Sequence, residues 1–600
     1  MKSLKSLNKY LFRYRTRLLL GTLFITISNV FAIYPAEILR EGIDLVAEGV
    51  NVHSLYNGSV LEPEMAGKFF KILLVFGLIV IAAALLKGLF MFFMRQTIIV
   101  MSRLIEYDLK NDIFAHYQKL DLAFYKKNKT GDLMARISED VSQVRMYVGP
   151  AIMYAIGTLT LFVLITAKML MINVELTVYV LAPLPILAFS IYFINSRVIQ
   201  RSAAVQTQLS SISSFVQEVF SGIRVVKAYN REDNVIGRFE EESDIYLKRN
   251  IALVRINALF FPMIILLIGL STLITIYVGG QKVFTGEITT GTIAEFIVYV
   301  GTLTWPVASI GWVTSIVQRA AASQIRINEF LSIEPDIQNH HSAPTEINGS
   351  VTFEHVSFTY PDSGIHAIND LSFTIEPGKS LAIVGRTGAG KSTIASLVTR
   401  MYDADTGRIL IDGKEIKEIN LDSLRSSIGY VPQEVFLFSE TIGNNVSFGL
   451  KHAENIPDLK QRINQAAMDS MIHDSISAFP DAYETKIGER GLTLSGGQKQ
   501  RISIARAIIR NPSILIFDDS LSAVDTETEE KILDNLRRIM KGRTTIIIAH
   551  RISTVKHCDQ IIVLDHGALA ESGSHQELLD KQGIYYGLHQ KQLLEEAVKE

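Results

Sequence analysis

Cysteine is almost absent from this chain, and neither sign of charge dominates it. The only cysteine, Cys558, excludes an intrachain disulfide and any metal centre built on several thiolates, so we expect it to fill space. The 59 basic and 61 acidic residues leave a net charge of −2, which gives no indication of a nucleic-acid partner. The mean hydropathy of +0.24 is too high for an average soluble enzyme, and the 20% charged residues are too many for a pure membrane protein. A chain that is part membrane domain and part soluble domain fits both values.

Long hydrophobic runs are concentrated in the first 320 residues. A helix needs about 20 apolar residues to cross the ~30 Å hydrocarbon core of a bilayer. Buried helices of a soluble protein do not explain runs of this length and number. We therefore expect an α-helical membrane domain in contact with the lipid bilayer. Its six spans should lie near Leu18–Ala36, Phe69–Met94, Tyr147–Ile172, Val174–Ile194, Ile256–Val278 and Thr292–Val317.

The distribution of basic residues predicts how these spans are oriented. The segment before the first span is rich in Lys and Arg and contains no acid, whereas the charged residues of segment 41–68 are mainly acidic. The segments 95–146 and 195–255 are again basic. Because basic loops stay on the cytoplasmic side, both termini are expected in the cytoplasm, and the chain in a bacterial plasma membrane.

Three charged residues lie in or near the predicted spans, namely Lys87, Lys168 and Glu295. Intramembrane charges are candidates for function because they are costly to bury. Lys168 and Glu295 can instead extend toward a membrane surface, which leaves Lys87 as the main candidate for a cavity.

Composition also predicts the order of domains. Residues 4–16 alternate apolar and basic positions at helical spacing, which is typical of a helix lying on anionic lipid, and we expect a cytoplasmic elbow helix over residues 1–17. The membrane domain, 18–329, should include helical cytoplasmic extensions over 95–146 and 195–255, with turns near Asn128–Asp132 and Ser221-Gly222. A Pro- and Gly-containing linker follows over 330–350. A soluble nucleotide-binding domain over 351–585 and a C-terminal helical tail over 586–600 complete the chain.

The soluble domain begins where short β-rich runs replace the long apolar ones. Helical stretches interleave with these runs, which predicts an α/β domain with a largely parallel sheet. The expected strands are Val351–Phe358, Ser380–Val384, Ile409–Ile411, Ile428–Val431, Ile514–Phe517, Thr544–Ala549 and Gln560–Leu564.

The phosphate-loop pattern G-x-x-x-x-G-K-[ST] follows the second of these runs. Its residues are Gly385, Arg386, Thr387, Gly388, Ala389, Gly390, Lys391 and Ser392, with Thr393 next in the helix. The glycines let backbone N–H groups surround phosphate oxygens, Lys391 can reach the β- and γ-phosphates, and the Ser392 hydroxyl can ligate Mg²⁺. The pattern therefore predicts a P-loop ATPase domain that binds ATP and Mg²⁺.

Two further strand ends are expected at the same edge of the sheet. Asp518 and Asp519 directly follow the apolar run Ser513–Phe517, and a carboxylate at this strand end can serve as a ligand of Mg²⁺. His550 ends the run Thr544–Ala549, and we expect it to contact the γ-phosphate.

With these motifs in order, the chain resembles the ATP-binding cassette exporters, specifically half-transporters with a membrane domain followed by a nucleotide-binding domain. Leu494-Ser495-Gly496-Gly497-Gln498 matches the family signature. The resemblance implies that Tyr360 stacks on adenine, and that Gln433 senses Mg²⁺ and the membrane domain. It also implies that the loop with Asp525 crosses between paired domains. The regions 124–140 and 218–228 are similar to coupling helices, and Thr485–Gly491 is similar to a segment peculiar to exporters.

This resemblance implies a dimer. A signature at a helix N-terminus presents backbone donors to a phosphate, and in this family it closes on a nucleotide held by a second chain. The expected partner is therefore a second half-transporter.

One residue departs from the family pattern. Family members usually carry glutamate after the Mg²⁺ aspartate, whereas this chain has Asp519, whose carboxylate reaches about 1 Å less far. A displacement of that size can cost about 100-fold in rate. Either Asp519 works slowly as the catalytic residue of a homodimer, or the chain is the impaired half of a heterodimer. We favour the heterodimer, because asymmetric bacterial multidrug exporters carry a similar Asp-Asp run in one subunit.

The resemblance also implies the kind of substrate. Exporters of this type move hydrophobic or amphipathic compounds such as drugs, lipids or peptides, and the sequence does not distinguish among them. The alternative function is a nucleotide-binding regulatory subunit whose turnover resides in a partner. An ATPase assay with and without that partner separates the two hypotheses.

Overall fold

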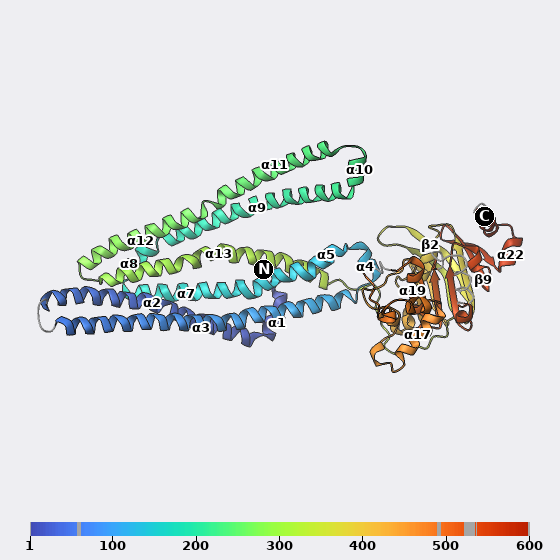
Figure 1. Cartoon of the computed structure of the whole chain (residues 1–600), viewed down its shortest axis with the longest axis horizontal. Coiled ribbons are helices and arrows are strands. Elements are labelled where there is room, and N and C mark those ends of the chain that lie inside the picture. The colour runs from blue at the N-terminus through green and yellow to red at the C-terminus, as the bar shows by residue number, and fades with distance from the viewer. Residues whose placement is uncertain (1, 57–61, 489–493, 521–534, 536, 598–600) are drawn as a thin grey trace. The chain divides into compact units, whose positions relative to one another are not determined.

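The computed structural model describes residues 2–56, 62–488, 494–520, 535 and 537–597, which form two compact units (Figure 1). The first, here called the membrane unit, comprises Met1–Tyr117 and Gly131–Ile333. The second, here called the nucleotide unit, comprises Gln118–Thr130 and Glu334–Glu600. A short part of the loop between the second and third spans therefore packs with the C-terminal half of the chain.

The membrane unit contains six helical rods long and apolar enough to span a bilayer among the described residues. Each predicted span lies within one of them, so the six-span prediction is confirmed. Large apolar side chains such as Leu74, Phe92 and Phe189 are exposed on the rods, as a lipid solvent requires. The rods are α2 (Arg15–Tyr56), α3 (Glu62–Tyr117), a composite over Thr130–Ile172 ending in α7 (Ile152–Ile172), α8 (Val174–Leu181) with α9 (Pro183–Ser221), α11 (Glu232–Asn257) with α12 (Phe260–Phe284), and α13 (Thr290–Leu331).

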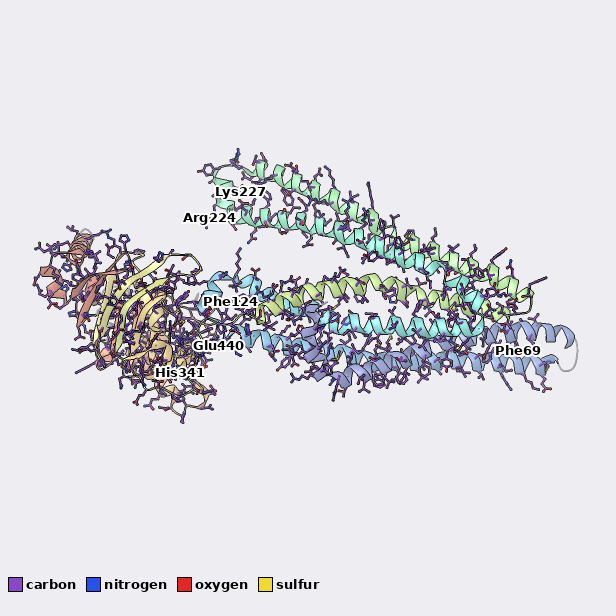
Figure 2. The ribbon with its side chains drawn as sticks, turned by 180° about the vertical axis from the view of Figure 1, so that it is seen from behind. Phe69, Phe124, Arg224, Lys227, His341 and Glu440 are labelled. Atoms are coloured by element: carbon purple, nitrogen blue, oxygen red, sulfur yellow. The ribbon has the colours of Figure 1, made fainter. Side chains whose placement is uncertain are left out.

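Helices α9 and α11 run side by side well beyond the apolar runs, as expected for cytoplasmic extensions (Figure 1). The short helix α10 (Ile223–Ala228) joins them after Gly222, close to the predicted turn. Arg224 and Lys227 lie at this tip (Figure 2). No residue of α10 or α11 is buried in the chain. The tip of this hairpin therefore leaves apolar side chains, including Phe220 and Tyr229, exposed.

The N-terminal segment forms two short helices, η1 (Lys2–Leu7) and α1 (Asn8–Arg13). Two aspartates of α3 hold it: Lys9 Nζ lies 3.1 Å from Asp112, and Arg13 Nη1 lies 3.0 Å from Asp108. The Tyr10 hydroxyl also donates to Asp112 at 2.6 Å. Part of the basic charge of the elbow is thus paired within the protein, and contact of this segment with anionic lipid stays a prediction.

The nucleotide unit is built on two sheets. The larger has the order β10-β9-β3-β8-β7-β6 and is parallel except for its edge strand β10, which confirms the largely parallel α/β prediction. The smaller sheet, β2-β1-β4-β5, is antiparallel and was not predicted. The strands are β1 (Val351–Thr359), β2 (His366–Ile375), β3 (Ser380–Gly385), β4 (Thr406–Ile411), β5 (Lys414–Glu415), β6 (Ile428–Val431), β7 (Ile514–Asp518), β8 (Thr544–Ile548), β9 (Gln560–Asp565) and β10 (Ala568–Gly573).

Sequence reasoning missed three of these strands, β2, β5 and β10. In β2 the residues Leu371, Phe373 and Ile375 are buried and alternate with exposed ones, so a period of two marked this strand in the sequence. Strand β10 has Leu569 as its one large apolar residue, contains no buried position and pairs at the edge of its sheet, which leaves no such pattern.

The chain ends in the helices α22 (His575–Asp580) and α23 (Ile584–Ala597). Tyr585 in the first turn of α23 is fully buried in the core of the nucleotide unit. The expected boundary between residues 585 and 586 falls inside this helix. Cys558 is also buried in that core, and burial raises the pKa of its thiol to about 12, as expected for a residue that fills space.

Candidate nucleotide site and membrane cavity

The phosphate loop connects β3 to α14 (Lys391–Val398) as the sequence predicted. Gly390 precedes the helix with a φ of +92°, and a Cβ at this position would lie 2.2 Å from the Ala367 carbonyl oxygen. Only glycine meets both constraints, so the close approach of the loop to its neighbour depends on this residue.

Lys391 directs its ammonium into the loop. Its Nζ donates to the carbonyl oxygens of Gly385 and Arg386, both at 2.9 Å. The side chain is almost fully buried, and burial lowers the pKa of Lys391 while the nearby charges of Asp519 and Asp518 oppose that shift. A cation held by neutral carbonyl groups is well placed to pair with the phosphate oxygens that such loops surround.

Asp518 ends β7 beside this loop. Ser392 Oγ donates to Asp518 Oδ1 at 2.8 Å, and the carboxylate is 3% exposed. Burial raises the pKa of Asp518, and the Ser392 hydrogen bond only partly offsets this. A buried carboxylate paired with a hydroxyl is an oxygen donor set that suits Mg²⁺.

Asp519 lies one residue further along the chain, near Gln433. Gln433 Nε2 lies 3.4 Å from Asp519 Oδ2. The Asp519 amide donates to the Ile548 carbonyl at 2.8 Å, and its φ is +44°. Aspartate adopts this left-handed backbone more readily than most residues.

His550 follows β8, which pairs in parallel with β7 and aligns Ile548 with Asp518. The register therefore brings His550 to the sheet edge that carries Asp518 and Asp519. Gln592 of α23 spans this loop: its amide donates to the His550 carbonyl oxygen and accepts from the Ile552 amide at 2.8 Å. Sequence reasoning did not predict this contact.

Tyr360 lies just after β1, and its hydroxyl is hydrogen-bonded to Thr393 Oγ1 at 3.0 Å. The ring expected to stack on adenine is thus tied to the first turn of α14. Tyr402 and Lys126 also contact this ring, and sequence reasoning did not identify either residue.

The signature residues form the start of α19 (Gly496–Ile508). Ser495 and Gln498 make a reciprocal capping box. The backbone N–H of Gln498 donates to Ser495 Oγ, and the backbone N–H of Ser495 donates to Gln498 Oε1. Gly496 and Gly497 occupy the first turn, so their backbone groups lie at the positive end of the helix. Asp525 and residues 489–491 of the exporter-specific segment lie outside the described residues.

The charged residues of the spans are paired. Glu295 is fully buried and accepts from Arg40 Nη1 at 3.1 Å and from the Tyr299 hydroxyl at 2.7 Å. Lys168 Nζ lies 2.9 Å from Glu37. These pairs connect α2 to α7 and α13, so neither Lys168 nor Glu295 extends alone to a membrane surface. Lys87 is exposed on α3 and does not line the cavity described next.

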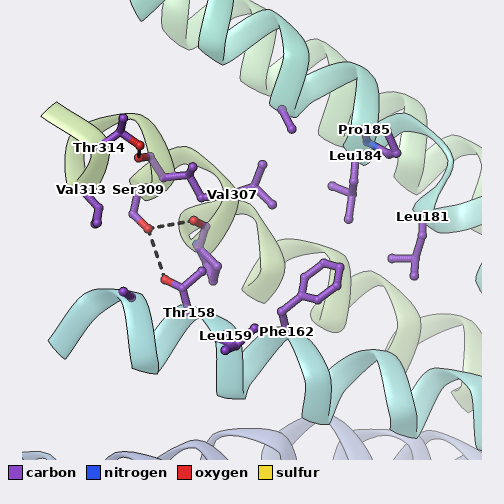
Figure 3. Close-up of a pocket in the computed structure, with 14 residues that line it drawn as sticks. Thr158, Leu159, Phe162, Leu181, Leu184, Pro185, Val307, Ser309, Val313 and Thr314 are labelled. Carbon is purple, nitrogen blue, oxygen red and sulfur yellow. Dashed lines mark hydrogen bonds between the residues drawn. The ribbon is translucent and has the colours of Figure 1, made fainter. Parts of the chain in front are cut away.

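A cavity of about 580 Å³ lies between α7, α8 and α9, and α13 (Figure 3). None of the described residues that line it is charged. Phe162, Leu184 and Val307 are among its apolar walls. Ser309 Oγ donates to the Pro306 carbonyl at 2.8 Å and lies 3.3 Å from Thr158 Oγ1. Because the Ser309 hydroxyl already donates its proton to the Pro306 carbonyl, the Thr158 hydroxyl is the donor to Ser309.

A second hollow of about 290 Å³ adjoins the first and shares Ala188, Val307, Ile310 and Thr314 with it. Its walls add polar side chains, including Asn195, Gln200 and Gln318. The two hollows together provide an apolar end and an uncharged polar end.

Two family models match the chain. One, described as "ABC transporter transmembrane region", covers residues 18–307, and the other, described as "ABC transporter", covers residues 368–522. The chain belongs to the ATP-binding cassette transporters. It is therefore a multi-pass membrane protein with an ATP-binding domain, and an ATPase coupled to transport.

Individual relatives match along nearly the whole chain. A Bacillus subtilis (strain 168) protein named "Probable multidrug resistance ABC transporter ATP-binding/permease protein YheI" is 36% identical over 98% of both chains. An "ATP-dependent lipid A-core flippase" of Syntrophus aciditrophicus (strain SB) is 35% identical over 87% of this chain and 86% of its own. A solved structure of "a bacterial Atm1-family ABC exporter with ATP bound" shares 28% identity and a TM-score of 0.77, covering 96% of this chain and 98% of that one. The fold is therefore that of the exporters of this family.

Proposed function

We propose that this chain is one half of a dimeric exporter that uses ATP and Mg²⁺ to move hydrophobic or amphipathic compounds, such as drugs or lipids, across the bacterial plasma membrane. The uncharged cavity between α7, α9 and α13 carries the proposal, because its apolar and polar ends suit an uncharged amphipathic molecule. The relatives named for multidrug resistance and for lipid A-core flipping support the same substrate class. Both termini and the nucleotide unit lie in the cytoplasm.

The roles proposed for the residues of the nucleotide unit rest on the family resemblance and are supported by the contacts described above. Lys391 and the backbone of Gly385–Thr393 hold the phosphates, and Tyr360 stacks on adenine. Ser392, Asp518 and Gln433 would hold Mg²⁺, whose charge would polarise the γ-phosphate. Mg²⁺ is usually bound through few protein groups, so nucleotide phosphates and water would supply the remaining ligands. Asp519 and His550 act on the γ-phosphate side.

A second half-transporter completes the assembly. The exposed apolar side chains at the tip of the α9–α11 hairpin, such as Phe220, Ile223 and Tyr229, are a surface that a second chain can cover. The start of α19, with Ser495 and Gln498, is available to a nucleotide held by that chain. Asp525 would lie at the junction between the two nucleotide domains.

Transport in proteoliposomes tests the exporter proposal. We expect the chain, with its partner where one is needed, to move a neutral fluorescent NBD-labelled lipid or a lipophilic dye only when ATP and Mg²⁺ are present. Phe162→Ala should raise the KM for the transported probe several-fold, because the ring forms part of the apolar wall. Phe92→Ala is the matched control, since Phe92 is exposed on α3 outside the cavity. Equal transport by the parent and Phe162→Ala would contradict the cavity assignment.

A second candidate is a regulatory half with an impaired site of its own, and Asp519 favours it. The Asp519 carboxylate lies 3.4 Å from Gln433, and its side chain is one methylene shorter than the glutamate usual in the family, so it reaches less far toward a γ-phosphate. In the heterodimer that we favour, most turnover resides in the partner's site, which this chain's signature completes.

Substitutions at Asp519 separate the two assemblies. In a heterodimer, Asp519→Asn should change ATPase activity only modestly and leave ATP trapped at this site. In a homodimer, Asp519→Glu should raise turnover and Asp519→Asn should lower it. A 100-fold fall for Asp519→Asn, about 2.7 kcal/mol of transition-state stabilisation, would show that Asp519 is the working base and exclude the heterodimer.

A further inference from the structure

The short helix α4 (Leu122–Lys127) belongs to the nucleotide unit although it lies in the loop between two membrane spans. Asp121 caps it by accepting from the Phe124 amide at 3.0 Å, and also accepts from the Asp336 amide at 2.9 Å. Ala123 packs against the core that contains β1 and α14. These contacts fix the position of α4 beside Tyr360.

Tyr360 forms one wall of an aromatic corner. Its ring centroid lies 5.5 Å from that of Tyr402, and the two ring planes are nearly perpendicular, at 89°. Phe358 packs against Tyr360 at 5.0 Å with an angle of 80°. Phe358 and Tyr402 are buried, whereas Tyr360 is only half-buried and keeps part of its surface accessible.

The ammonium of Lys126 lies in this corner. Its Nζ is 4.5 Å from the centroid of the Tyr360 ring and 5.3 Å from that of Tyr402. A cation at this distance over a ring face is attracted by the negative charge of the π system. A side chain from the membrane-domain loop thus occupies the ring to which we assign adenine stacking.

We propose that Lys126 and the adenine base compete for the face of Tyr360, so that base binding displaces the Lys126 ammonium from the aromatic corner. The inference rests on the proposed function of Tyr360 as the adenine platform. A stacked base must lie in van der Waals contact with the ring, which leaves no room for an ammonium on the same face. Base stacking on an aromatic side chain is stronger than an exposed cation–π contact, so the base displaces the cation at a cost in affinity. The Lys126 side chain, in the loop that joins two spans, thereby responds to occupancy of the nucleotide site.

Nucleotide affinity tests this competition directly. Binding of ATP in EDTA, which prevents hydrolysis, is measured on the full-length protein by titration calorimetry. Lys126→Ala should bind ATP about 2- to 5-fold more tightly than the parent, the range that corresponds to an exposed cation–π contact. Lys126→Gln should behave in the same way, which provides a second variant if alanine perturbs α4. Lys127→Ala is the matched control, because it removes the same charge from the next position of α4.

A double-substitution cycle identifies the ring involved. In a Tyr360→Ala background, Lys126→Ala should no longer tighten ATP binding. Unchanged or weaker binding by both Lys126 variants relative to Lys127→Ala would overturn the competition. If Tyr360→Ala itself leaves ATP affinity unchanged, the adenine platform is wrong and the proposed site fails first. If Tyr360→Ala weakens binding but the Lys126 variants do not strengthen it, only the inference about Lys126 fails.

Discussion

At the scale of single residues, the nucleotide site combines charges that are unfavourable for folding. Asp518 is buried and accepts a hydrogen bond from the Ser392 hydroxyl, and its raised pKa means that the native state disfavours the ionised carboxylate. The Lys391 ammonium is buried as well, and its pKa is lowered for the same reason. Under the proposed function, both groups would find better partners in a nucleotide with Mg²⁺ than in the protein alone.

The prediction at this scale concerns Asp518→Asn. The folded pKa of Asp518 lies above its unfolded value, so ionisation lowers stability as pH rises from the unfolded pKa through the folded one. At pH 7 the neutral amide should therefore raise the thermal unfolding temperature of the protein in nucleotide-free, Mg²⁺-free buffer. Turnover at this chain's own site should fall at least about 100-fold.

The unfolding temperature is measured by intrinsic fluorescence across a pH series. The gain should shrink as pH falls toward the ordinary range of aspartate. Asp565→Asn at the end of β9 is the control and should show no comparable gain. A lower unfolding temperature for Asp518→Asn would contradict the interpretation of its pKa.

At the scale of elements, the C-terminal helix α23 supports the loop that carries His550. The two amide atoms of Gln592 bridge the His550 carbonyl and the Ile552 amide, and Tyr585 anchors the start of the helix in the core. The helix is therefore a structural part of the nucleotide unit, and Gln592 is a positioning residue for His550.

Gln592→Ala should lower kcat at this chain's own site several-fold while leaving KM nearly unchanged, because a net hydrogen bond contributes about 1 kcal/mol. The rate is measured in an assembly in which the other nucleotide site has been inactivated. Gln592→Glu keeps the acceptor for Ile552 but loses the donor to His550, and should give a similar loss. Gln590→Ala, two residues earlier on the exposed side of α23, should match the parent. A fall in unfolding temperature with unchanged kcat would mean that Gln592 acts only on stability.

At the scale of the whole molecule, two surfaces require a second chain under the proposed function. One is the apolar tip of the α9–α11 hairpin. The other is the start of α19, where the capping box uses the backbone N–H of Gln498 and leaves those of Gly496 and Gly497 for an anion. Each of these two surfaces is formed by a few residues at a turn or at the start of a helix.

Ser495→Arg tests whether the signature acts on a nucleotide held by the other chain. The bulky cation should block that site while leaving ATP binding at Lys391 nearly intact. In a heterodimer, most turnover should be lost although nucleotide affinity at this chain's site is kept, as measured by photolabelling of each subunit. Lys499→Ala is the control within the first turns of α19. Retained turnover in the Ser495→Arg assembly would contradict completion in trans.

The sequence by itself determined the features that depend on contiguous residues. Six apolar runs of membrane-spanning length, the phosphate loop at Gly385–Ser392 and the strand ending in Asp518 were all predicted, because run length and motif spacing are local properties. The paired carboxylate and hydroxyl of Asp518 and Ser392 could also be expected, since parallel strands end at one edge.

Only the tertiary structure decided the contacts between residues far apart in the chain. It paired Arg40 with Glu295 and Lys168 with Glu37, where the sequence left each charge without a partner. It placed Lys126 over Tyr360 and Gln592 on the loop of His550. No local pattern encodes these pairs, because they arise from how helices and sheets pack, and the free energy of packing depends on surfaces rather than on neighbours in sequence.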